Sequence, residues 1–303
     1  MSQRDTVTIR VPGSTSNCGA GFDTLGMAVN VSNAVTVSRL ADSAEPQAMR
    51  DSDVRAQEMV TAAATLFFKT TRQMVFGFTY EINGEVPTAR GLGSSVTVRA
   101  GIIAALDILA DTKLTRPQIV AMVSELEGHP DNAASSVLGG FCVARSDPQT
   151  GAYIDTIRIE VPEELVFVVA SPLSEISTES SRDILPKTLP YFDAVRSINS
   201  ATYLVAAMAT GDYDRLKDAV SDFMHEPYRL PGISGASDAL ASGVRAGALT
   251  GWLSGSGSSV MCVCRREVGE AVLSAMCSAL TDQGLECDAS ILQADNTGLV
   301  PLD

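Results

Sequence analysis

The stretch PTARGLGSSVT, residues 87–97, places two glycines and two serines directly before the apolar run VRAGIIAALDILA. The N-terminus of a helix carries unpaired backbone N–H groups and about half a unit of positive charge, so it attracts phosphate. Gly91 and Gly93 allow the backbone to approach a ligand closely. Ser94 and Ser95 add hydroxyl donors. The stretch predicts a phosphate-binding loop, and the plain alternative is a glycine-rich turn with a serine N-cap.

Other glycine-rich signatures do not fit this loop. A P-loop requires Gly-x4-Gly-Lys-Ser/Thr, and the stretch contains no lysine. The dinucleotide fingerprint requires a third glycine where Val96 stands. The Gly-x-Ser-x-Gly elbow of hydrolases is absent here and also at 254–259.

A second polar stretch, ELEGHPDN (125–132), combines carboxylates, a histidine and an asparagine. Mg²⁺ is usually held by one or two carboxylates together with phosphate oxygens and water. Glu125 and Glu127 are two residues apart, so only one of them can face a site if the segment is helical. The residues alone leave open which one does so, and a helix end followed by a polar turn is the simpler interpretation.

Two loops rich in small residues are ambiguous when taken separately. In SNCGAGFDTLG (16–26), Asn17 and Asp23 can bind a polar ligand, but they can equally form Asx turns. LSGSGSS (253–259) lies between two apolar runs, which favours a tight turn that approaches a ligand or another backbone.

Two further stretches each carry an arginine after polar residues, STESSRDILP (177–186) and HEPYRLP (225–231). Arginine pairs bidentately with a carboxylate or phosphate, although a surface ion pair is its commoner role. His225 is more typical of a structural histidine than of a ligand.

Hydrophobic periodicity indicates the elements that must position these residues. It predicts strands over 6–11, 27–40, 74–84, 165–172 and 286–294, a strand, a glycine turn and a second strand within 252–264, and a short helix and a strand after 129. It predicts helices over 53–71, 94–110, 115–128, 191–210, 212–224, 233–246 and 266–284. The pattern restarts at about residue 161, so we expect two α+β domains, 1–160 and 161–303.

Length and charge limit the possible functions. A chain of 303 residues exceeds the usual size of one hydrophobic core. The net charge of −14 argues against nucleic acid and anionic membranes as partners. No apolar run reaches the ~20 residues of a membrane span, and the first residues lack a signal-peptide pattern, so we expect a cytoplasmic protein.

The six cysteines form no CxxC pair and have no histidines at metal-ligand spacing, so we expect no zinc site. They are interpreted as buried free thiols. Cys262 and Cys264 alternate within SVMCVC, which predicts that both lie on one face of a strand.

Taken in order, the motifs resemble those of the homoserine kinase family, within the GHMP small-molecule kinase superfamily. The series is VPxSxxNxGxGFDxLG, GLGSS, EGHPDN with GGF, STExxRxxLP, HxPYR and LSGSGxS, and it extends from about residue 7 to 265. GLGSS and SGSG are shared across the superfamily, whereas EGHPDN, STExxR and HEPYR point to the narrower family.

This resemblance implies an N-terminal domain like ribosomal protein S5 domain 2 and a ferredoxin-like C-terminal domain. It implies that ATP lies on the glycine-rich loop with its phosphates at the start of the helix, where Mg²⁺ supplies charge that a Walker lysine would otherwise give. The nucleotide would contact Pro87, Arg90, Gly91, Leu92, Gly93, Ser94, Ser95, Val96 and Thr97.

The resemblance also implies the remaining site residues. Glu127 would bind Mg²⁺ with Ser95, and Glu125 is the alternative. L-Homoserine would be held by Asn17, Asp23, His129, Asn132, Thr178, Arg182, Arg229, Gly255 and Gly257. Of these residues, Asn132, Arg182 and His129 would act in catalysis.

The implied reaction transfers the γ-phosphoryl group of ATP to the side-chain hydroxyl of L-homoserine. Some related kinases carry an aspartate base where this chain has Asn132. Asparagine cannot deprotonate a hydroxyl, so positioning and charge stabilisation must dominate, and the proton can pass to a phosphate oxygen. The side chain of Asp131 is expected to point elsewhere.

Three positions depart from the family pattern, namely Val96, Ser258 and Cys18. We expect Val96 to turn into the core and leave the phosphate site open. Two alternatives remain: a GHMP kinase for another small hydroxylated metabolite, such as threonine or mevalonate, and a catalytically silent metabolite-binding relative. Relatives also suggest a homodimer.

Overall fold

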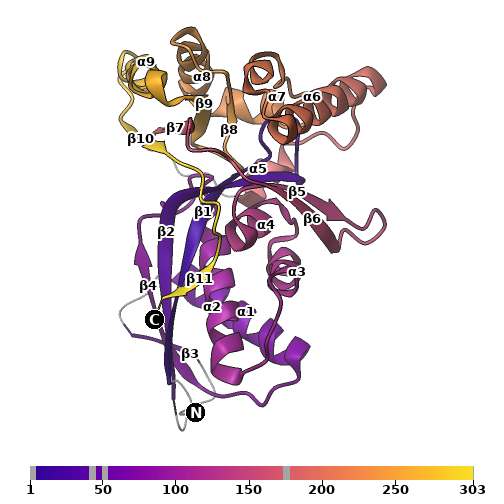
Figure 1. The fold of residues 1–303 in the computed structure, drawn as a ribbon, viewed down its shortest axis with the longest axis vertical. Coiled ribbons are helices and arrows are strands. Elements are labelled where there is room, and N and C mark those ends of the chain that lie inside the picture. The colour runs from indigo at the N-terminus through magenta and orange to yellow at the C-terminus, as the bar shows by residue number, and fades with distance from the viewer. Residues whose placement is uncertain (1–4, 41–45, 50–53, 173–177, 303) are drawn as a thin grey trace.

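The computed structural model describes residues 5–40, 46–49, 54–172 and 178–302, which form two β-sheets with helices packed on each (Figure 1). The larger sheet has the order β11-β1-β2-β4-β3, and β5 pairs with β2 and with β6. Its strands are β1 (Thr6–Ser16), β2 (Leu25–Arg39), β3 (Pro46–Ala48), β4 (Phe78–Gly84), β5 (Phe141–Ser146), β6 (Tyr153–Ile159) and β11 (Val300–Leu302).

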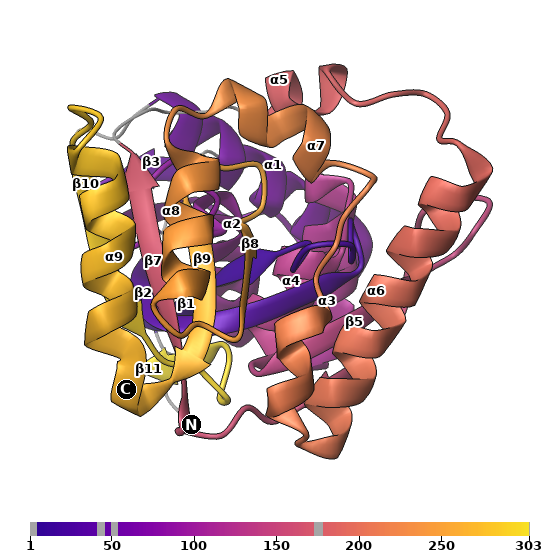
Figure 2. The same cartoon turned by 90° about the horizontal axis from the view of Figure 1, so that it is seen from above.

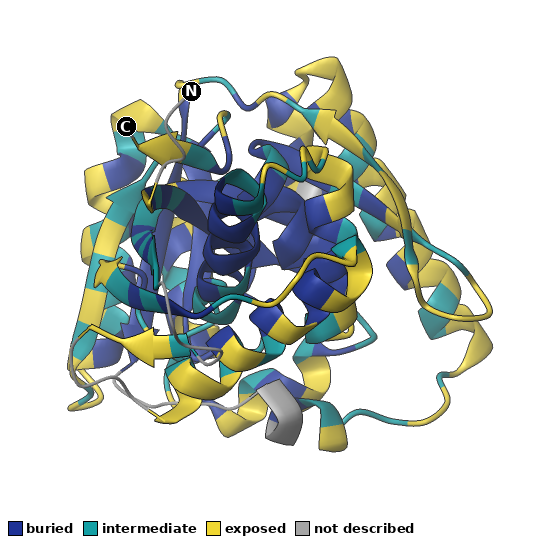
Figure 3. Cartoon of the chain, turned by 90° about the horizontal axis from the view of Figure 1, so that it is seen from below, coloured by how far each residue is buried: buried dark blue, intermediate teal, exposed yellow. Residues whose placement is uncertain are grey.

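Helices α1 (Val54–Thr71), α2 (Ser94–Ala110), α3 (Arg116–Glu127) and α4 (Asp131–Leu138) pack beside this sheet. The central helix α2 is buried along almost its whole length, because β1, β2 and the other three helices surround it. This explains why its sequence is apolar on nearly every side. Figure 3 shows the buried residues gathered at the centre of the molecule and the exposed ones around its periphery.

Local signals set the ends of α3, as the sequence predicts. Thr115 accepts a hydrogen bond from the backbone N–H of Gln118, whose side chain accepts one from the N–H of Thr115. This is a capping box, and Pro117 lies in the first turn, where the missing N–H costs nothing. Gly128 ends the helix with φ 81°, which brings the chain into the 129–132 segment.

The smaller sheet has the order β10-β7-β9-β8. Its strands are β7 (Leu165–Pro172), β8 (Thr250–Leu253), β9 (Val260–Arg265) and β10 (Cys287–Leu292). All residues of β7 are buried, because α8 (Ala236–Arg245) and α9 (Gly269–Thr281) cover one face, side by side in Figure 2. The other face packs on β2 through contacts such as Phe167 with the cluster around Met27. The two sheets therefore share one apolar layer.

Several elements of the structure differ from the sequence prediction. Residues 212–224 form only a 3₁₀ helix at Tyr213–Asp218. Strand β6 was not expected, and β10 is not the final strand, because β11 follows it and pairs with β1. The proposed division into 1–160 and 161–303 stays a prediction.

Three further helices lie in the second half of the chain, α5 (Thr178–Asp183), α6 (Tyr191–Thr210) and α7 (Glu226–Arg229).

All six cysteines are free thiols, four of them buried and two half-buried. Cys262 and Cys264 lie in the same core cluster, as the alternation predicts. Among the described residues, no helix has the length and apolar character needed to cross a membrane.

Candidate active site

The glycine-rich loop approaches other parts of the chain so closely that glycine is needed at two positions. Gly91 and Gly93 have φ of 76° and 70°, a region that side chains disfavour. A Cβ on Gly91 would lie 2.0 Å from the carbonyl oxygen of Ser254, and one on Gly93 would lie 2.6 Å from Ser14 Oγ. Helix α2 then begins with no side-chain cap and no acidic residue in its first turn, so no carboxylate there would repel a phosphate.

The turn between β8 and β9 closes on this loop from the other sheet. The hydroxyl of Ser254 donates to the carbonyl oxygen of Gly91 at 2.6 Å, and the N–H of Gly255 donates to the carbonyl oxygen of Ser16 at 3.3 Å. The expectation of a tight turn that approaches another backbone is confirmed. The site is therefore formed where the two sheets meet.

A cavity of about 220 Å³ lies at this junction. Many of the residues singled out in the sequence line it: Asn17, Asp23, Arg90, Gly91, Gly93, Ser94, Ser95, Glu127, His129, Asn132, Arg182, Arg229 and Gly255. They come from the loop after β1, the start of α2, the α3–α4 junction, α5, α7 and the β8–β9 turn.

Five predicted site residues do not line the cavity, and for each the packing gives the reason. The side chains of Leu92 and Val96 are buried in the core, as was expected of Val96. Thr97 accepts a hydrogen bond from Asn33 Nδ2 inside the protein. Pro87 lies with Leu92 at a separate hollow.

Gly257 is held within the turn, where its N–H donates to the carbonyl oxygen of Ser254. Thr178 begins α5, but its side chain lies outside the described residues.

The sequence did not identify several residues that line the cavity: Ser16, Phe22, Arg55, Met59, Thr88, Ala89, Asp131 and Ser256. Thr88 and Ala89 lie inside the quoted stretch, between Pro87 and Arg90, but no motif there marks them as site residues. Arg55 and Met59 belong to α1, whose ordinary amphipathic pattern carries no signal for a site.

A second cavity of about 400 Å³ adjoins the first and shares four lining residues with it, Arg55, Met59, Thr88 and Ser94. It lies against α1 and β4 on the far side of the glycine-rich loop. The two cavities together form an elongated site along the loop.

The helix register brings Glu127, not Glu125, to the cavity. Ser95 Oγ donates to the Glu127 carboxylate at 3.0 Å, and Arg99 donates to it at 2.6 Å. Glu125 is exposed and does not line the cavity. Oxygen donors from α3 and from the start of α2 are therefore adjacent.

Asp131 lines the cavity, contrary to the expectation that it points elsewhere. Its carboxylate lies 2.5 Å from Nδ1 of His129, and both side chains are buried. Burial alone would lower the pKa of His129, but the Asp131 charge outweighs it and raises that pKa. Burial likewise opposes ionisation of Asp131, yet His129 holds its pKa below the ordinary value. The two residues form a buried ion pair.

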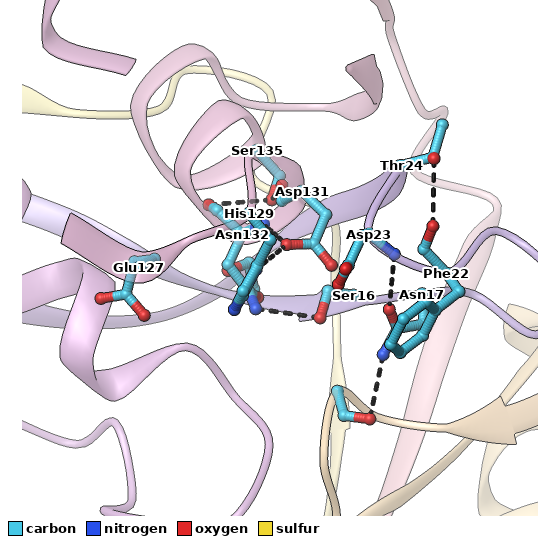
Figure 4. Close-up of polar contacts among 12 residues, drawn as sticks. Ser16, Asn17, Phe22, Asp23, Thr24, Glu127, His129, Asp131, Asn132 and Ser135 are labelled. Atoms are coloured by element: carbon cyan, nitrogen blue, oxygen red, sulfur yellow. Dashed lines mark hydrogen bonds and ion pairs between the residues drawn. The ribbon is translucent and has the colours of Figure 1, made fainter. Parts of the chain in front are cut away.

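Both ends of the Asn132 side-chain amide are hydrogen-bonded within the protein. Its amide oxygen accepts from Ser14 Oγ at 2.9 Å, and its amide nitrogen donates to Ser16 Oγ at 2.9 Å. Figure 4 shows Asn132 beside His129 and Asp131, with Glu127 set apart from them. The side chain is fixed and has no basic group.

Two arginines converge on the loop after β1. Arg182 donates to both carboxylate oxygens of Asp23, at 2.6 and 3.0 Å. The guanidinium carbons of Arg182 and Arg229 each lie 5.2 Å from the centre of the Phe22 ring. Burial lowers the pKa of Arg229 to about 10, and the nearby Arg182 charge contributes. The Arg229 guanidinium is thus a poorly hydrated cation that gains by meeting an anion.

Asn17 has a structural role in the loop. Its side-chain oxygen accepts from the N–H of Asp23 at 3.0 Å, and its amide nitrogen donates to the carbonyl oxygen of Gly255 at 3.0 Å. Asn17 and Asp23 both have positive φ, 67° and 53°. Figure 4 shows these bonds, with Asp23 beside Asp131.

Asp23, His129 and Asp131 bring potential metal-ligand atoms within 4.8 Å of one another. Each carboxylate already has a cationic partner, Arg182 for Asp23 and His129 for Asp131. Their negative charge is therefore balanced by protein groups, as that of Glu127 is by Arg99.

Family models match the two halves of the chain. The model of the GHMP kinases N terminal domain matches residues 58–140, and that of the GHMP kinases C terminal matches residues 204–282. The chain therefore belongs to the GHMP kinase family.

Within that family, its relatives include proteins named homoserine kinase. The one from Moorella thermoacetica is 37% identical over 299 residues, covering 96% of this chain and 98% of that protein. The one from Synechococcus sp. (strain WH7803) is 33% identical, covering 97% and 95%. A crystal structure of homoserine kinase from Cytophaga hutchinsonii superposes with a TM-score of 0.88 at 25% identity, covering 100% and 99%. The expected two-domain GHMP kinase fold is confirmed.

Proposed function

We propose that this protein is a homoserine kinase, which transfers the γ-phosphoryl group of ATP to the side-chain hydroxyl of L-homoserine and forms O-phospho-L-homoserine for threonine biosynthesis. The observation that carries the proposal is the convergence of Arg182 and Arg229, beside Asp23, in the same cavity as the start of α2. The arginines suit a carboxylate and Asp23 suits an ammonium group, so the cavity has the charges that an amino acid requires.

ATP is proposed to bind along the glycine-rich loop. The lack of side chains at Gly91 and Gly93 permits close approach of phosphates to the backbone. Arg90 lines the cavity, and among the described residues its Nη1 is buried without a hydrogen-bond partner, which suits an anionic ligand. The adjoining cavity between α1 and β4 is the space available for the nucleoside.

Mg²⁺ is proposed to be held by Glu127 and Ser95. A carboxylate and a hydroxyl are the hard oxygen donors that this ion prefers, and they lie beside the helix start where phosphates would bind. The ion would supply positive charge to the transferred phosphoryl group.

The chain's own residues would act by alignment and not as a general base. Three carboxylates line the described part of the cavity, Asp23, Glu127 and Asp131, and each is paired with a cation. Asn132 is held by two serine hydroxyls and cannot accept the substrate proton. The proton is therefore proposed to leave on a phosphate oxygen, which is compatible with a loose transition state.

A coupled assay of ADP release with homoserine, serine, threonine and mevalonate tests this function. We expect kcat/KM to be highest for homoserine by about tenfold or more, because the arginine pair and Asp23 select an amino acid and the cavity must also fit its length. A higher kcat/KM for threonine or mevalonate would show that this compound, and not homoserine, is the substrate. Absence of ADP with all four would favour a silent relative.

We also propose that the enzyme is a cytoplasmic homodimer. The sequence predicts the cytoplasmic location, and the family resemblance suggests the dimer. Light scattering on the purified protein would give twice the mass of the 303-residue chain. A single-chain mass would refute the dimer.

A further inference from the structure

His225 is a buried histidine that contacts both halves of the chain at the edge of the candidate site. It lies immediately before α7, and its side chain is fully buried. Its Nε2 lies 2.8 Å from the carbonyl oxygen of Gly19, and its ring lies 5.2 Å from the ring of Phe22. Both partners belong to the loop that follows β1, so this side chain joins the second half of the chain to the first.

The hydrogen bonds define which nitrogen of His225 carries the proton. A carbonyl oxygen only accepts, so Nε2 must donate to Gly19. Nδ1 lies 3.5 Å from Nη1 of Arg229, which only donates, so Nδ1 must accept. Burial lowers the pKa of His225, although Asp222 opposes the shift, and the neutral ring that results suits both contacts.

Arg229 is held by this contact and by two others. Its Nε donates to the carbonyl oxygen of Ser181 at 3.0 Å, and its Nη1 donates to that of Gly255 at 3.3 Å. We propose that His225 is a positioning residue of the substrate site, which ties Arg229 to the loop after β1 and so holds the guanidinium where an amino-acid carboxylate binds. The identity of that amino acid rests on the proposed homoserine kinase function.

The charged groups around His225 determine how pH should act on this arrangement. Asp222 and Arg229 face it from its own segment, and Asp23 acts on it from the loop. Asp222 also accepts from the N–H groups of Met224, His225 and Glu226, so it is committed to starting α7. A proton on Nδ1 would turn the acceptor for Arg229 into a donor and add a like charge beside it.

Steady-state kinetics of His225→Ala and His225→Gln provide the first test. For His225→Ala we expect the KM for homoserine to rise about tenfold, as for loss of one hydrogen bond to a charged group, with kcat and the KM for ATP nearly unchanged. Gln can still donate to Gly19, so His225→Gln should recover part of this loss. Tyr228→Ala is the matched control, because Tyr228 lies on α7 but does not line the cavity. Wild-type KM values in both His225 variants would overturn the proposal.

The pH dependence of the KM for homoserine gives a second test, because a purely structural role of His225 would not produce it. In the wild type, the KM for homoserine should rise as the pH falls below 6.5, the ordinary pKa of histidine, whereas the profile of His225→Gln should lack this rise. Titration of ATP itself affects both proteins equally. If the KM for homoserine rose equally at acid pH in the wild type and in His225→Gln, the proposed role of His225 would be wrong.

A crystal structure of His225→Ala tests the positioning without turnover. We expect the Arg229 guanidinium to leave the carbonyl oxygens of Ser181 and Gly255, and an unmoved guanidinium would overturn the proposal. If the wild type does not phosphorylate homoserine, the proposed function fails, while this structural result still decides the role of His225.

Discussion

At the scale of single residues, we propose that recognition of a substrate carboxylate depends most on the Arg229 guanidinium, which burial leaves poorly hydrated. Arg229→Ala should raise the KM for homoserine by about ten- to a hundredfold, because it removes the charged partner of the carboxylate. Arg229→Lys should recover only part of the affinity, since the lysine ammonium group cannot form the two parallel hydrogen bonds that a planar guanidinium makes with a carboxylate. The KM for ATP serves as the internal control, and an unchanged KM for homoserine would contradict the carboxylate role.

Glu127 and Glu125 provide a matched pair of variants for testing the proposed metal site, because only Glu127 lines the cavity. Glu127→Gln should lower turnover about tenfold or more and shift the Mg²⁺ titration of activity to higher concentration, with little change in homoserine binding. Glu125→Gln should behave like the wild type. The reverse result would show that the helix register used for the metal site is wrong.

Single residues also show the limit of sequence interpretation. The family resemblance, and not motif spacing, named Ser95, Glu127 and His129 as site residues. All three line the cavity, where the start of α2 meets the end of α3. Arg55 and Met59 could not be named, since they enter the site only through the packing of α1. The orientation of Asp131 depends on its buried contact with His129, which spacing does not reveal.

At the scale of elements, the junction of the glycine-rich loop with the β8–β9 turn should be the least tolerant of added bulk. Gly91→Ala would place a methyl group 2.0 Å from the carbonyl oxygen of Ser254, so we expect weaker ATP binding and lower stability. Gly151→Ala is the matched control, because its φ of 74° is similar and nothing lies within 4 Å. It should lose only about 1 kcal/mol of unfolding free energy and keep the wild-type KM for ATP. Equal effects of the two variants would contradict the importance of this junction.

The elements with long periodic patterns were predictable, and the exceptions have physical reasons. Helix α3 follows its capping box and its C-terminal glycine, and helix α2 follows its long apolar run. Strand β6 is half-buried only at Tyr153, Thr156 and Ile159 and exposed at the two residues between each of these, so it lacks the alternation that predicts a strand. β11 has only three residues, too few for a pattern. The helix expected over 212–224 is cut short, and Asp222 there instead caps the next segment.

At the scale of the whole molecule, the buried carboxyl of Glu226 should make stability depend on pH. It accepts a hydrogen bond from the N–H of Leu253, and burial raises its pKa to about 8, well above the ordinary 4.5. The folded state therefore keeps a proton that the unfolded state releases, so stability should fall as the pH rises from 4.5 to 8. Glu226→Gln keeps the acceptor and removes the ionisation. Urea unfolding at pH 5, 7 and 9 should show that the unfolding free energy of this variant depends less on pH than that of the wild type. Equal pH dependence in the two proteins would contradict the raised pKa of Glu226.

The pairing of β11 with β1 joins residues about 290 positions apart, Arg10 with Val300. Ribosomes add about 5–20 residues per second, so β11 is synthesised roughly 15–60 s after β1, and one edge of β1 stays unpaired during that time. During that interval the nascent polypeptide exposes unpaired backbone amides along a strand that is otherwise ready to fold. Until translation has passed residue 302, we therefore expect Thr8–Arg10 to be an exposed strand edge on each nascent chain, where a neighbouring chain on the polysome could pair.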